Sequence, residues 1–215
     1  MCGKFTQMMA WDRLVDLDEL IRSTSGSPET VTPMRFAAVI CCGDGKRKTV
    51  RMRWGFVPAH AHDPMVGTKF IHARAETLDE KPTFRDAFFN RRGLVVVRTF
   101  NEGKEITPRK TEQHVITPRD GKPLAIAVIW EHWAGSPAPG LDSFAMVTVP
   151  ANQLIGTITD RMPAVVLPEH WAAWLGETPA SVDEIKANLR HIEGDWEMQP
   201  EKPKREPPPR QASLF

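Results

Sequence analysis

A series of short strand patterns separated by turn residues fills the middle of this chain, and it constrains the fold more than any other feature. Residues 35–42 and 46–56 have strand composition, and the Gly-Asp-Gly sequence at 43–45 between them is typical of a β-hairpin turn. Residues 93–100 form an almost continuous apolar segment, which indicates a strand buried on both faces. Because turns rather than helices join these strands, the sequence lacks the βαβ pattern of a parallel sheet.

A second hairpin is predicted further along the chain. The Pro-Arg-Asp-Gly sequence at 118–121 lies between strand patterns at 114–117 and 124–130. Residues 144–149 are a further predicted strand.

Helical signals lie in three parts of the chain. They comprise residues 10–22 and 83–92, helix starts at Pro150 and Pro168, a helix stop at Gly176, and a capping box formed by Ser181 and Glu184. The predicted fold is α+β, with a single domain over residues 1–198 and a curved, largely antiparallel, barrel-like β-sheet flanked by helices. The Pro-rich and charged residues 199–215 are predicted to be a disordered tail.

Composition favours a soluble protein of the cytoplasm. Of the 215 residues, 41% are hydrophobic and 26% are charged, which is ordinary for a globular chain of this size. The net charge of +1 creates no global attraction to nucleic acid, so any basic surface must be local. The three cysteines fit neither a disulfide framework nor a zinc site, and no apolar run approaches the ~20 residues of a membrane span. We therefore expect no cofactor, no metal and no membrane partner.

The chain begins Met1-Cys2-Gly3, so that removal of Met1 would free the α-amine of a cysteine. A small second side chain favours that removal. The product is a 1,2-aminothiol, with an amine of pKa about 8 and a thiol of pKa about 8.5 on adjacent carbons. The amine can condense with an aldehyde to a Schiff base, and the thiol can then close a thiazolidine ring. The other interpretation is that Cys2 is a small apolar residue at a frayed terminus.

Three arginines share one face of the predicted strand at 46–56, and two interpretations of them are open. Arg47, Arg51 and Arg53 form either a solvated sheet face or a phosphate-binding row. The His-Ala-His-Asp sequence at 60–63 has no supporting Cys or His spacing elsewhere, and it is interpreted as a polar loop rather than a metal site.

Five short segments stand out as an ordered set. They are Met1-Cys2-Gly3 with Phe5, then Trp54-Gly55, the Ala-Arg-Ala-Glu-Thr sequence at 73–77, Glu102 after an apolar strand, and Arg161-Met162-Pro163. Together they resemble the SOS response-associated peptidase (SRAP) family, whose bacterial and human members act on abasic DNA. The resemblance runs from Met1 to about Pro168.

The resemblance implies that Cys2 traps the ring-opened aldehyde of an abasic site in single-stranded DNA as a stable thiazolidine. Glu102, held near the terminus with a raised pKa, would move protons during dehydration and ring closure. Trp54 and Phe56 would stack on bases or lie in the core. The residues implied to contact DNA are Arg74, Arg47, Arg51, Arg53, Trp54 and Arg161. The implied setting is the DNA-damage (SOS) response at the nucleoid.

The chain also departs from the family pattern. His72 stands where the family has Asn, and Thr159 stands where the family has His. Lys4 replaces an Arg, and Asn101 and Gly103 replace the aromatic residues around the family's Glu. Two interpretations are open: either His72 takes over part of the proton chemistry, or the site is degraded and the protein is a non-catalytic DNA binder. A third hypothesis is a peptidase that removes only its own Met1.

The last five residues carry a separate signal. Gln211, Leu214 and Phe215 resemble the Gln-x-Ser/Asp-Leu-Phe peptides that bind bacterial sliding clamps. The Gln would form hydrogen bonds, and the two apolar side chains would enter a preformed pocket. The Pro-rich residues before them would act as a tether that raises the local concentration of the domain. The other interpretation is an accidental apolar end.

Overall fold

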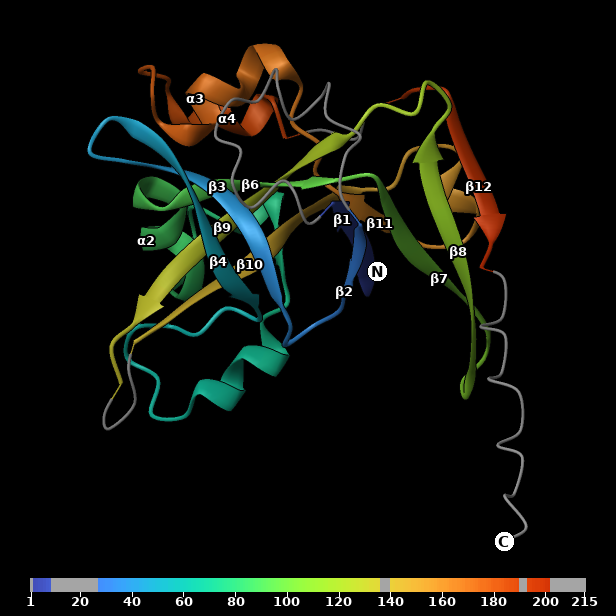
Figure 1. Cartoon of the computed structure of the whole chain (residues 1–215), viewed down its shortest axis with the longest axis horizontal. Helices are drawn as coiled ribbons and strands as arrows, with labels where there is room; N and C mark the ends of the chain where they lie inside the picture. The colour runs from blue at the N-terminus through green and yellow to red at the C-terminus, as the bar shows by residue number, and fades with distance from the viewer. Residues whose placement is uncertain (1, 9–26, 136–139, 190–192, 202–215) are drawn as a thin grey trace, which may run out of the picture.

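Two β-sheets form the framework of the part of the chain that the structure, a computed structural model, describes. The described residues are 2–8, 27–135, 140–189 and 193–201 (Figure 1). The predicted helix at 10–22 and the tail residues 202–215 lie outside them. No helix in the described part of the chain is both long and apolar enough to cross a membrane.

The larger sheet contains a closed ring of five strands. β4 pairs with β3, β3 with β6, β6 with β9, and β9 with β10, and β10 pairs back to β4 in parallel through Ser143↔Arg53 and Phe144↔Trp54. This closure confirms the predicted barrel-like, mainly antiparallel architecture. The strands are β3 (Phe36–Gly43), β4 (Lys46–Trp54), β6 (Arg92–Val97), β9 (Leu124–Trp133) and β10 (Leu141–Pro150).

Two short strands extend the barrel along β10. β5 (His72–Arg74) runs parallel to β10, and β11 (Arg161–Pro163) runs antiparallel to its last residues. Two of the five segments that carried the family resemblance therefore both pair with the same strand, β10. The segment around Arg161 is this strand and not, as its position between predicted helices suggested, a link between two helices.

The second sheet is open and antiparallel throughout. Its strand order is β12-β8-β7-β1-β2, and Figure 1 shows β7, β8 and β12 on the right, with β1 next to the barrel. The core fills the space between the sheets, where Phe5, Trp54 and Phe100 are fully buried. The strands are β1 (Lys4–Met8), β2 (Pro28–Val31), β7 (Thr99–Thr107), β8 (Lys110–Pro118) and β12 (Trp196–Pro200).

Short helices lie around the sheets. A helix was predicted at residues 83–92, and α2 covers Pro82–Asn90. Pro168 begins a short helix as predicted, and Gly176 ends α3 with a left-handed φ of 79°. The predicted capping box is present, because Ser181 accepts from the Glu184 backbone while the Glu184 side chain accepts from that of Ser181. The elements are η2 (Pro64–Lys69), η3 (Ala75–Thr77), α2 (Pro82–Asn90), η4 (Ile155–Thr157), η5 (Pro168–His170), α3 (Trp171–Leu175) and α4 (Val182–Ala187).

The apolar segment 93–100 is two strands and not one, which corrects the sequence interpretation. β6 ends at Val97 in the barrel, and β7 begins at Thr99 in the second sheet. Arg98 lies between them, and its backbone N–H donates to Thr6 O at 2.8 Å. Both halves are buried, so an apolar pattern alone gives no sign that the chain changes sheet. As a result Glu102 lies within a strand rather than after one.

The predicted hairpin at 118–121 is half right. The turn forms, with a φ of 69° at Gly121 and a hydrogen bond from its N–H to Pro118 O at 3.0 Å. The flanking strands β8 and β9 do not pair, however, because they belong to different sheets. Turn residues fix a local reversal of the chain but not the partner of the next strand. Pro150 likewise ends β10, where it pairs with Arg161, and does not start a helix.

The first hairpin is as predicted, since β3 and β4 pair from Phe36↔Arg53 to Gly43↔Lys46. Asp44 and Gly45 both have positive φ values, 53° and 70°. This combination is the requirement of a type I′ turn, which explains the Asp-Gly sequence.

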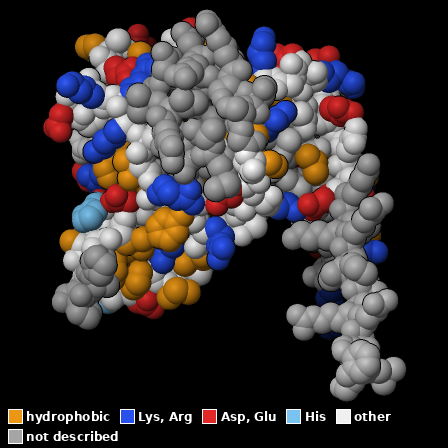
Figure 2. Space-filling view, in the orientation of Figure 1, with side chains coloured by type: hydrophobic (Ala, Val, Ile, Leu, Met, Phe, Trp, Pro, Cys, Tyr) orange, Lys and Arg blue, Asp and Glu red, His pale blue; other side chains and the backbone are white. Residues whose placement is uncertain are grey.

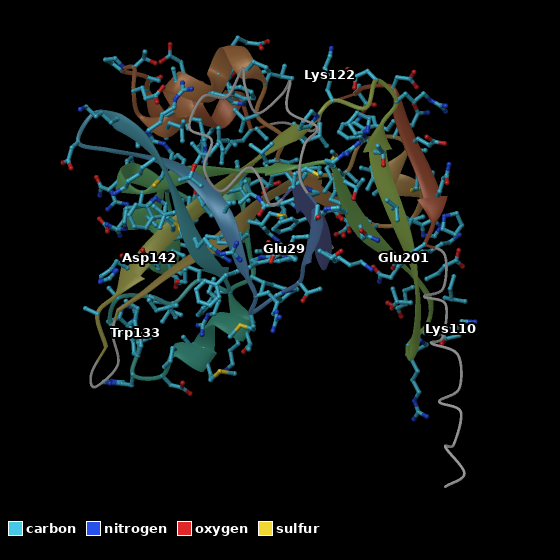
Figure 3. The ribbon with its side chains drawn as sticks, viewed as in Figure 1. Glu29, Lys110, Lys122, Trp133, Asp142 and Glu201 are labelled. Carbon is cyan, nitrogen blue, oxygen red and sulfur yellow. The ribbon has the colours of Figure 1, made fainter. Side chains whose placement is uncertain are left out.

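The ordered domain continues past residue 198. Gln199 and Pro200 pair with β8, the Glu201 N–H donates to Gln113 O at 2.7 Å, and the Glu201 carboxylate lies 2.5 Å from the Lys4 ammonium (Figure 3). The paired residues thus extend to Glu201, beyond residue 198.

Candidate active site at the amino terminus

Cys2 lies just before β1, the strand between β2 and β7 in the open sheet. It is 1% exposed, and its Sγ donates to Lys4 O at 3.4 Å. Burial raises the pKa of the Cys2 thiol well above its usual range, and the nearby charge of Glu102 raises it further. The thiol is therefore protonated at neutral pH. Cys2 is not at a frayed, exposed end.

Glu102 is brought to Cys2 by the register of two strands. Lys4 of β1 pairs with Asn101 of β7, so the residue after Asn101 lies beside the residues that precede β1. Glu102 is fully buried, and burial raises the pKa of its carboxyl group to about 7, an increase that hydrogen bonding with the Cys2 backbone partly offsets. A carboxyl group with this pKa can both donate and accept a proton near neutral pH.

His72 reaches the same place from the barrel. It is the first residue of β5, and its ring meets that of Trp54 edge-on with 6.0 Å between centroids. Burial lowers the pKa of His72 to about 4, while the nearby Cys2 backbone opposes the decrease. The imidazole is therefore neutral at pH 7. The structure thus brings together Cys2, Glu102 and His72, the three residues assigned to the chemistry from sequence.

Aromatic side chains form the floor beneath these groups. Trp54 has no exposed surface, and its Nε1–H donates to Ile71 O at 2.8 Å. Its ring centroid lies 5.1 Å from that of Phe5 and 6.3 Å from that of Phe144, on which it stacks. Phe56 is also fully buried. Trp54 is therefore a core residue in this structure, which corrects its assignment as a base-stacking surface. Because a strand buries alternate side chains, the sequence of β4 was already compatible with a buried Trp54.

The two arginines of the motif segments differ in environment. Arg74 is exposed at the end of β5, two residues from His72. Arg161 is 9% exposed and forms a two-point ion pair with Glu76, with distances of 2.6 and 2.9 Å, and it also donates to Thr148 O at 2.6 Å. The Arg161 guanidinium lowers the pKa of Glu76. Arg161 therefore ties η3 to β10, and Arg74 has the exposure that a phosphate contact needs.

The arginines of β4 do not act as one row. Arg47 pairs with Glu177 at 2.5 Å, Arg51 lies 3.5 Å from Glu29, and Arg53 donates to Pro64 O at 2.5 Å. These side chains share a strand face but contact three different segments. The interpretation as a continuous phosphate-binding row is thus corrected, because strand alternation predicts the face and not the neighbours above it.

Two residues of the site neighbourhood were not found from sequence. After burial, the charge of Asp160 also raises the pKa of Glu102. Gln7 is 3% exposed, donates to Ala38 O and Val96 O at 3.0 Å, and accepts from Ala38 N–H at 3.1 Å. No sequence pattern singled out Gln7, because Lys4 and Thr6 of the same strand are polar too. Gln7 fixes β1 to the barrel.

The remaining sequence candidates lie elsewhere. Asp63 caps η2 by accepting from Met65 N–H at 2.8 Å, in keeping with a polar loop. Gln211, Leu214 and Phe215 lie outside the described residues.

A family model of SOS response associated peptidase (SRAP) matches residues 1–203 of the chain. The chain belongs to the SRAP family. Its relatives include abasic site processing protein YoqW of Bacillus subtilis, which is 28% identical over 199 residues, with 91% of this chain and 89% of the relative covered. Abasic site processing protein YedK of Escherichia coli is 26% identical over 184 residues, with 81% of this chain and 79% of the relative covered.

Solved structures have the same fold as this SRAP chain. A protein from Bacteroides thetaiotaomicron superposes with a TM-score of 0.77 at 20% identity, with 94% of this chain and 93% of that one covered. A protein from Bordetella bronchiseptica has a TM-score of 0.73 at 20% identity and covers 94% and 100%.

Proposed function

We propose that this protein binds abasic sites in single-stranded DNA and forms a covalent thiazolidine cross-link through Cys2 after Met1 has been removed. The observation that carries the proposal is the burial of the Cys2 thiol beside Glu102, whose carboxyl pKa is about 7. The names of the relatives, abasic site processing proteins, support the same substrate. An aminothiol next to a proton donor and acceptor suits capture of an aldehyde.

The first stage joins the amine to the sugar aldehyde. The free α-amine of Cys2 attacks the aldehyde carbon of the ring-opened abasic site, which gives a carbinolamine. Glu102 in its protonated form donates to the departing hydroxyl group, and one water molecule leaves as the C=N bond of the Schiff base forms. A carboxyl group with a pKa near 7 retains this proton at neutral pH, whereas an ordinary glutamate does not.

The second stage closes the ring. The Cys2 sulfur attacks the carbon of the protonated Schiff base, the C–S bond forms, and the electron pair of the C=N bond returns to nitrogen, which keeps its proton as a neutral amine. Because burial keeps the thiol protonated, a base must accept its proton during the attack, and ionised Glu102 fulfils that role. Neutral His72 beside Cys2 is a second acceptor. Overall the thiol proton restores the proton that Glu102 donated in the first stage, and one water molecule is the only product released.

The test is a denaturing gel of the protein incubated with abasic single-stranded DNA. The wild-type protein is expected to give a band shifted by covalent attachment, and Cys2→Ala is expected to give none while its binding to intact single-stranded DNA is unchanged. A matched control is Cys42→Ala, which removes a partly buried cysteine of β3. A mass spectrum of the same sample must show loss of Met1, since a retained methionine blocks the amine.

A non-catalytic DNA binder is the second candidate, favoured by Thr159 in place of the family histidine. It predicts normal affinity for single-stranded DNA with no covalent band. The variant His72→Ala separates the interpretations of His72: a wild-type cross-linking rate removes His72 from the chemistry. A self-processing peptidase predicts instead that Cys2→Ala retains Met1 when wild-type protein loses it.

The C-terminal residues are part of the same proposal. Gln211, Leu214 and Phe215 would bind the sliding clamp, and the clamp would bring the domain to replicating DNA at the nucleoid, where damage exposes single strands in the SOS response. Deletion of residues 211–215 is expected to abolish retention of the protein on immobilised clamp and to leave the cross-linking rate on short oligonucleotides unchanged. Retention of the truncated protein contradicts this part.

A further inference from the structure

An exposed phenylalanine begins β3, close to the candidate site. Phe36 is 44% exposed and pairs with Arg53 across the β3–β4 hairpin, so its ring lies on the outer face of the barrel. The other exposed phenylalanine among the described residues, Phe89 on α2, lies against the Phe88 ring at 5.3 Å, with the Arg85 guanidinium 5.3 Å from its own ring centroid. Phe36 thus offers an aromatic surface, and Phe89 serves as its natural control.

Positive charge borders the Phe36 ring. The Arg51 guanidinium donates to Phe36 O at 3.4 Å and its side chain is 43% exposed, and Arg35 is exposed directly before Phe36. Figure 2 shows hydrophobic side chains next to Lys and Arg on this face, over the ends of β3 and β4. Arg51 contacts Glu29 of β2, which Figure 3 labels, at 3.5 Å, and an exposed pair at that separation contributes little, so a phosphate can replace the carboxylate.

Backbone hydrogen bonds connect this surface to the site. Met34 N–H donates to Trp54 O at 2.7 Å, and Trp54 N–H donates to Arg35 O at 2.9 Å, while the Trp54 ring contacts His72. Met34 has a φ of 68°, which is costly for a residue with a side chain and persists where the surroundings enforce it. The turn before Phe36 is therefore held against the floor of the site.

We propose that Phe36 is a stacking platform for the base of a nucleotide next to the captured sugar, with Arg35 and Arg51 holding its phosphates. Bases stack on aromatic rings whatever their sequence, and arginines beside the ring supply the electrostatic attraction that unpaired strands need. This inference rests on the proposed function for its ligand. It assigns to Phe36 the stacking role that the buried Trp54 does not have.

The experiment measures binding of intact single-stranded oligonucleotides that contain one 2-aminopurine, whose fluorescence is quenched by stacking. Phe36→Ala is expected to raise Kd about tenfold and to remove the quenching, because stacking on one ring contributes on the order of 1–3 kcal/mol. Phe36→Trp is expected to retain the wild-type Kd and the quenching, and Phe89→Ala is expected to leave the Kd and the quenching unchanged. Arg51→Gln is expected to lower the slope of log Kd against log salt by about 0.7.

The inference is overturned if Phe36→Ala binds and quenches like wild type, and this result leaves the proposed cross-linking untouched. It is also overturned if Phe89→Ala weakens binding as much as Phe36→Ala does. If wild-type protein forms no covalent band while Phe36→Ala still loses affinity and quenching, the proposed cross-linking fails and the platform stands. Near-wild-type melting temperatures for the Phe36 variants exclude unfolding as the cause.

Discussion

The closed barrel and the open sheet contribute different things to the candidate site. The barrel has no free edges along its five-stranded ring and supplies fixed groups, the Trp54 floor and His72. The open sheet ends at β2 and β12 and carries the two groups that would exchange protons and form bonds, Glu102 and Cys2. The reactive terminus therefore belongs to the less constrained sheet, and the more rigid one provides its support.

The seam between the two regions explains how a chain terminus is held in place. Termini of domains are poorly ordered unless they are tied down. Here β1 pairs on both sides, and Gln7 adds three hydrogen bonds to the barrel backbone. The position of Cys2 therefore depends on contacts to both sheets.

The largest effect is expected from replacing Glu102, the buried carboxylic acid of the open sheet. Glu102→Gln keeps the shape but removes proton exchange, and we expect the cross-linking rate to fall about 100-fold. The wild-type rate should change with pH around 7, where Glu102 titrates, and the variant should lack that inflection. Cross-linking is measured on gels from pH 5.5 to about 8.5. An unchanged inflection in Glu102→Gln assigns the titration to another group.

The same variant has a second consequence, for stability. The folded pKa of Glu102, about 7, lies above the 4.5 of an unperturbed glutamate, so the carboxyl group contributes stability fully below 4.5 and loses it as pH rises through 7. Glu102→Gln cannot ionise, and we expect it to exceed wild type by up to about 3 kcal/mol in free energy of unfolding at pH 8. Urea denaturation at pH 5 and pH 8 measures this, and an equal difference at both values contradicts it.

A smaller effect is expected at the seam. Gln7→Leu leaves Ala38 N–H, Ala38 O and Val96 O without their side-chain partner, so we expect a loss of about 2–3 kcal/mol in the free energy of unfolding. The control is Gln199→Leu, at an exposed position of β12 whose side chain bonds only to its neighbour Glu197 among the described residues. If both variants lose the same free energy of unfolding, Gln7 does not stabilise the contact between the two sheets.

The smallest effect is expected at the edge of the open sheet. The Lys4–Glu201 pair is partly exposed, with side-chain exposures of 20% and 34%, and such pairs contribute about 0–1 kcal/mol. Lys4→Met should therefore change the unfolding free energy by less than ~1 kcal/mol at 0.15 M salt. A larger loss would show that the segment at Glu201 supports β1, as Gln7 does.

Local elements followed from the sequence because their causes are local. Asp44-Gly45 supports the two positive φ values of its turn, Ser181 and Glu184 satisfy each other's backbone donors, and Gly176 ends its helix in the left-handed region. The order of the motifs also indicates the family, and it points to Cys2, Glu102 and His72 as residues of the candidate site.

Tertiary structure decided what lies next to what. The change of sheet at Arg98, the separation of β8 from β9, the burial of Trp54 and the closing of the barrel by β10 against β4 all depend on contacts between distant residues. The raised carboxyl pKa of Glu102 has the same origin, because it comes from burial against the chain terminus. A sequence specifies dihedral preferences and apolar patterns residue by residue, whereas strand partners and desolvation exist only once the whole chain has packed.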